Sequence, residues 1–64
     1  MRSNRTDLTR LALAIHAGYV DEYVVVMPRH SARSAKRHLL RHSPDLRVEC
    51  RIIDPETAIL EVRP

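Results

Sequence analysis

Three arginines have a spacing that points directly to a chemical role. Arg33, Arg37 and Arg41 recur every four residues, so on a helix they share one stripe. Several guanidinium groups on a rigid element suit phosphates and carboxylates. An ordinary solvated face would mix signs, whereas residues 31–42 contain no acid. We therefore predict a site for an anionic macromolecule, either nucleic acid or an acidic protein surface, formed by Arg29, His30, Arg33, Lys36, Arg37 and Arg41.

The distribution of charge along the chain agrees with this interpretation. Residues 28–51 hold seven basic and two acidic residues, a net charge of +5, whereas residues 1–27 are balanced and residues 52–64 carry −2. The total of +3 therefore belongs to one segment and not to the whole surface. A concentrated charge of one sign is typical of a surface that attracts a partner of the opposite sign.

Histidines gather in the same segment. His38 and His42 are four residues apart, a helical spacing that can hold a metal ion. The segment lacks the intervening glutamate of a zinc protease, and no third ligand is evident, so we predict no metal site. Together with His30, these side chains would add positive charge to the basic face below about pH 6.5.

The other reactive side chains form no catalytic pattern. Cys50 falls at an inward position of a predicted strand, where cysteine behaves as a small apolar residue. Ser31 or Ser34 could in principle form a hydrolytic pair with His30. However, serine caps helices far more often than it attacks carbonyls. The only glycine is Gly18, so a glycine-rich phosphate loop is absent. We predict no catalytic residue, no cofactor and no enzymatic activity.

Length and composition limit the class of protein. A chain of 64 residues should form a single domain, frayed over residues 1–5, that buries only about 60% of its unfolded surface. Without Trp or Phe and with one Cys, we expect self-association to reinforce so small a core. A lone Cys favours a reducing compartment, and the longest uncharged run, Leu11–Val20, is too short to span a bilayer. We expect a cytoplasmic protein with no membrane contact.

Apolar residues recur at helical spacing in two segments. They predict helices over residues 6–17 and 31–42. Thr6 or Asn4 is expected to cap the first helix, and Ser31 the second, because their side-chain oxygens can accept bonds from free backbone N–H groups.

Three further segments have the composition or the alternation of strands, at residues 22–27, 46–53 and 58–63. The first and second are joined by a helix, so they should run parallel. The second and third should form a hairpin, in which pairing Cys50 with Leu60 keeps the apolar residues on one face. The predicted fold is a small α+β two-layer sandwich in α-β-α-β-β order, with a three-stranded mixed sheet and two helices on one face.

Helices on one face of a small sheet leave its other face open. If Val24 and Val26 face the helices, the open face carries more apolar surface than a small monomer usually exposes. The alternative is a curled sheet whose Arg and Glu stems cover the patch. We predict an interface with a second copy or with a partner, formed by Tyr23, Val25, Met27, Ile53 and Ile59.

The element order resembles that of the small sulfur-carrier proteins related to sulfurtransferases, without their first strand. Their Cys-Pro motif at the first helix is absent, so the resemblance does not imply their activity. In size, charge and lack of motifs the chain also looks like small phage-encoded proteins, including inhibitors of host defence. The first hypothesis is a non-enzymatic module that binds nucleic acid or a nucleoprotein complex through helix 31–42. The alternative is a protein inhibitor or adaptor, for example an anti-CRISPR, that uses the open sheet face and docks the basic helix on an acidic protein.

Overall fold

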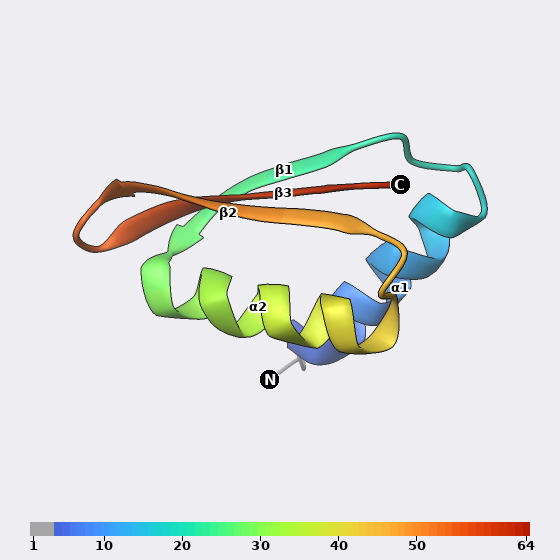
Figure 1. Cartoon of the computed structure of the whole chain (residues 1–64), viewed down its shortest axis with the longest axis horizontal. Coiled ribbons are helices and arrows are strands. Elements are labelled where there is room, and N and C mark those ends of the chain that lie inside the picture. The colour runs from blue at the N-terminus through green and yellow to red at the C-terminus, as the bar shows by residue number, and fades with distance from the viewer. Residues whose placement is uncertain (1–3) are drawn as a thin grey trace.

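Two helices pack against one face of a three-stranded sheet (Figure 1). The computed structural model describes residues 4–64. The predicted α+β fold and its α-β-α-β-β order are confirmed. The elements are α1 (Asn4–His16), β1 (Tyr23–Pro28), α2 (Arg29–His42), β2 (Arg47–Asp54) and β3 (Thr57–Arg63).

The last strand lies in the middle of the sheet, where the order is β1-β3-β2. Both β1 and β2 are antiparallel to β3, so they run parallel to each other, as predicted, without being neighbours. The sheet is therefore antiparallel in every pairing rather than mixed. The reason is that β3 returns from the hairpin turn into the gap that the α2 crossover leaves between β1 and β2.

The core is built around the inward row of β3. Ala58, Leu60 and Val62 are fully buried, with an exposed fraction of 0% each. The hairpin register places Cys50 opposite Leu60, which confirms the predicted pairing. Apolar residues from both helices, from the position just before β2 and from β2 itself complete the cluster: Ala12, Ile15, Ala35, Leu39, Leu46 and Val48.

The two faces of β1 are the reverse of what we predicted. Tyr23, Val25 and Met27 pack against the core, whereas Val24 and Val26 are 53% and 60% exposed. The register explains the reversal, because Val25 lies opposite the buried Leu60 and directly opposite residues of an antiparallel pair share a face. The prediction that Tyr23, Val25 and Met27 form an open interface is therefore wrong.

The other two predicted interface residues lie away from the core. Ile59 is half-buried opposite Val26, on the face of the sheet that the helices leave open. Ile53 is 52% exposed at an irregularity in register between Ile52 and Asp54, near the hairpin turn. The open face therefore still carries apolar residues, but on β1 these are Val24 and Val26 instead of Tyr23, Val25 and Met27.

Both helices begin two residues earlier than predicted. α2 follows Pro28 directly, no side chain caps it, and Ser31 lies inside the helix, so the predicted Ser31 cap is wrong. The backbone N–H of Arg29 instead donates to the carbonyl oxygen of Glu56 at 2.8 Å, which ties the start of α2 to the hairpin turn. α1 already includes Asn4 and the residue after it, which were expected to fray; residues 1–3 lie outside the described chain. Among the described residues no helix is long and apolar enough to cross a membrane.

The turn between β2 and β3 is held by one side chain. The Asp54 carboxylate accepts a hydrogen bond from the backbone N–H of Glu56 at 2.8 Å. This bond favours the charged form, so it holds the pKa of Asp54 below its ordinary value. Because the adjacent Glu56 carbonyl accepts from α2, the same turn also fixes where that helix begins.

Leu60→Ala should be severely destabilising. Truncating a buried leucine costs about 2–5 kcal/mol, a large share of a total near 5 kcal/mol for a domain this small. We expect thermal unfolding to shift down by about 10 °C or more. Ile53→Ala is the control, because that side chain is half exposed and its loss should change the Tm little. Equal melting of the two variants would contradict the inward position of Leu60.

Asp54→Ala should lower the Tm at neutral pH, because the turn loses its hydrogen bond. A lowered folded-state pKa stabilises above the unfolded value of about 3.9, and this contribution disappears as pH falls through the folded pKa. The Tm difference between wild type and Asp54→Ala should therefore shrink in acid. Asp54→Asn keeps the acceptor oxygen, so its difference from wild type should be smaller at neutral pH. A pH-independent deficit in Asp54→Ala would contradict this role for the carboxylate.

Candidate functional site

The basic side chains are carried by a helix whose inner face is small and apolar. Ala32 and Leu39 are fully buried and Ala35 is nearly so, and they form the stripe that faces the sheet. Helix α2 is rich in alanine, leucine, lysine and arginine, which are strong helix formers. The short alanine side chains bring the α2 backbone close to the sheet. The outer face is therefore presented on a rigid element.

The three arginines of the predicted stripe are all exposed on that outer face. A step of four residues turns an α-helix by slightly more than one full turn, an excess of about 40°. The row from Arg33 through Arg37 to Arg41 therefore drifts around the helix axis. Arg33 lies on the side of the hairpin turn, whereas Arg37 and Arg41 border α1. The basic surface is a slanted strip that connects two hollows.

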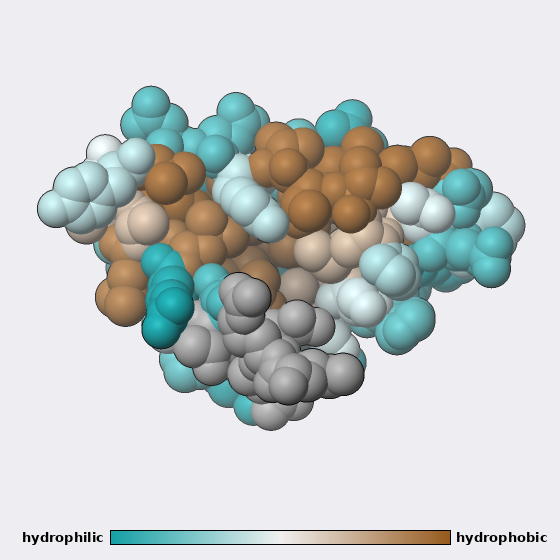
Figure 2. All heavy atoms as spheres, turned by 180° about the vertical axis from the view of Figure 1, so that it is seen from behind, coloured by the Kyte–Doolittle hydropathy of each residue, from teal (hydrophilic) through white to brown (hydrophobic). Residues whose placement is uncertain are grey.

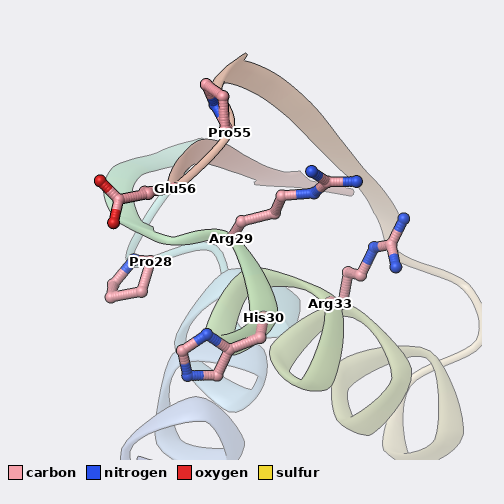
Figure 3. Close-up of a pocket in the computed structure, with 6 residues that line it drawn as sticks. All are labelled: Pro28, Arg29, His30, Arg33, Pro55 and Glu56. Atoms are coloured by element: carbon pink, nitrogen blue, oxygen red, sulfur yellow. The ribbon is translucent and has the colours of Figure 1, made fainter.

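The first hollow, of about 500 Å³, lies between the start of α2 and the hairpin turn. Arg29 and Arg33 extend in the same direction there, whereas Glu56 and His30 point away from them (Figure 3). The guanidinium groups of Arg29 and Arg33 thus share a region that the Glu56 carboxylate does not neutralise. An anion placed there would meet two planar donors from one turn of a helix.

The second hollow is a groove of about 640 Å³ between α1, the inner side of β1 and α2. Its α2 wall carries Arg37 and Arg41 together with His38, and Asp7 is the acid on the opposite wall. Thr9 Oγ1 lies 3.3 Å from His38 Nε2, which links α1 to α2. The groove is thus basic on its α2 side, and the two helices that border it are linked by this contact.

Two histidines of α2 lie beside each other. The rings of His38 and His42 lie 4.5 Å apart between centroids. In the part of the chain that the structure describes, no group of three His, Cys, Asp or Glu side chains is placed to hold a metal ion. Cys50 is half-buried on β2 and packs against the core cluster.

The ion pairs found among the described residues lie on the strands. Arg51 pairs with Glu61 at 3.0 Å, and Arg63 with Glu49 at 3.5 Å, all on β2 and β3. Over the described residues neither of these pairs includes an arginine or lysine of α2. The helix also contains no acid of its own. Among the described residues, positive charge without an ion-pair partner is therefore concentrated on α2.

The structure brings the six predicted binding residues onto one helix, with some differences in exposure. His30 and the three stripe arginines are exposed, while Arg29 and Lys36 are half-buried. Sequence reasoning missed the two hollows. Periodicity defines the face of α2, but it contains no signal for which segments of α1 and of the hairpin flank that face.

No protein-family model, curated protein or solved structure matches this chain. Its function is therefore inferred from the uncompensated charge of α2 and from the shape of the surface around it. Both features belong to the exposed strip that runs from Arg33 to Arg41.

Proposed function

We propose that this chain is a small non-enzymatic module that binds nucleic acid, free or within a nucleoprotein complex, through α2. The observation that carries the proposal is the strip of exposed arginines without a carboxylate partner among the described residues. Like charges four residues apart destabilise an isolated helix. Phosphates placed along the strip would remove that repulsion and release their own condensed counterions.

The length of the strip suits a phosphate backbone better than a single small anion. From Arg33 to Arg41 the helix rises about 12 Å. This distance equals roughly three to four steps of rise along the axis of B-DNA, so the strip is long enough to meet more than one phosphate. The slant of the strip from one hollow to the other would let Arg29 and Arg41 contact different phosphates. We therefore assign each arginine to a backbone phosphate, with α2 as the positioning element.

Little in the surroundings of α2 supports reading of base sequence. Tyr19 is 86% exposed but lies in the loop before β1, and Tyr23 is half-buried beside the core. Stacking platforms for unpaired bases need exposed aromatic rings beside the basic groove. α1 and α2 are also separated by β1 and form no helix-turn-helix. The proposal therefore predicts binding with weak sequence preference and strong dependence on salt.

Affinity for a short labelled DNA duplex should fall steeply with salt. With four phosphate contacts, the slope of log K against log salt concentration should be about −3 to −4. Arg37→Gln should reduce the slope by about 1, because it removes one contact. Arg51→Gln is the matched control: it removes the same charge, but from the ion-paired arginine on β2. Fluorescence anisotropy at several salt concentrations measures both variants and the wild type.

Charge reversal gives the stronger test. The combined variant Arg33→Glu, Arg37→Glu and Arg41→Glu should lose duplex binding and keep its thermal stability, since all three side chains are exposed. Duplex and RNA affinities equal to those of wild type would overturn the proposal. Absence of binding to DNA and RNA at low salt would also overturn it, and would leave an acidic protein as the partner of α2.

A further inference from the structure

The outer edge of β1 is an unprotected strand edge. β1 pairs with β3 on one side, and no described strand pairs with its other side. Natural edge strands are usually protected by charges, bulges or proline. The other edge strand, β2, has such protection: Arg47, Glu49 and Arg51 along it and an irregularity near Asp54. Residues 23–27 of β1 carry no charge, and the proline of β1 is its last residue.

The side chains around this edge are apolar and accessible. Val24 and Val26 are more than half exposed. Figure 2 shows an apolar surface that runs along β1 on the side of the molecule turned away from the viewer in Figure 1. An occupant of this edge should therefore supply both a strand and apolar side chains.

The charges that flank β1 identify the occupant. Asp21 and Glu22 precede the strand, and Arg29 and His30 follow it. The strand is therefore acidic at one end and basic at the other. An antiparallel copy of the same strand places its basic end beside the acidic end of the first, and the match occurs twice. We propose that the free edge of β1 pairs with the β1 edge of a second copy of this chain, so that one antiparallel sheet runs through a symmetric dimer.

The alternation of faces also selects a register. Directly opposite residues in an antiparallel pair share a face, which requires the twofold axis to pass through a residue of β1. With the axis at Val25, Val24 lies opposite the partner's Val26 on the open face. In the same register Tyr23 lies opposite the partner's Met27, so the acidic residues just before β1 lie near the start of the partner's α2. An axis at Val26 would instead place Val24 opposite the partner's Pro28, which has no N–H to donate.

The dimer is independent of the nucleic-acid proposal, because it is measured without nucleic acid. Sedimentation of the wild type at increasing concentration should show a mass twice that of the chain. Val26→Lys should give a monomer that keeps its circular-dichroism spectrum, because a charge would lie against the partner's Val24. Ile53→Lys is the matched control, with similar exposure away from β1, and it should remain a dimer.

Charge reversal before β1 tests the orientation. The double variant Asp21→Lys with Glu22→Lys should shift the equilibrium toward monomer, because it would place two cations beside the basic start of the partner's α2. A wild type that stays monomeric at millimolar concentration would overturn the inference, as would equal dissociation by Val26→Lys and Ile53→Lys. A monomer that still binds duplex DNA would overturn the dimer and leave the proposed function standing.

Discussion

The inward row of β3 is the constraint on which the rest of the structure depends. Leu60 lies opposite Val25 on one side and Cys50 on the other, so a single side chain sets the faces of all three strands. It is fully buried beneath the helices, in a chain that contains no Trp or Phe to enlarge the core. A slip of one residue in β3 would turn this row to solvent and remove most of the core.

The small core also determines which surfaces of the strands and of α2 carry the charged residues. The charged residues of β2 and β3 lie on the open face and compensate one another there, as Arg51 does with Glu61. α2 has no such possibility, because its inner face is alanine and leucine and its outer face has no acid within it. The same close packing that stabilises the fold through Ala32 and Ala35 therefore concentrates uncompensated charge on the opposite side of the helix.

The sequence predicted what periodicity controls and failed where a contact between distant segments decides. The α2 stripe and the Cys50–Leu60 pairing follow from regular spacing, and both could be assigned in advance. β1 contains three consecutive valines, so its pattern does not distinguish the two faces, and only its register with β3 decides between them. Ser31 had the right side chain for a cap, but a bond from Arg29 to the distant Glu56 sets the start of α2. The first hollow depends on where the hairpin turn lies and the second on how α1 packs, and no local pattern encodes either position.

The basic residues in the first turn of α2 are unfavourably placed in the field of the helix dipole. Arg29 and His30 stand where the helix dipole is positive, and no acid lies in that turn, whereas Arg41 and His42 at the other end are placed favourably. This end of the helix is electrostatically frustrated. Dissolved salt relieves that frustration by screening, while the same screening weakens the ion pairs of the strands. Rising ionic strength therefore changes the electrostatic stability of the two layers in opposite directions: it stabilises the start of α2 and weakens the ion pairs of the sheet.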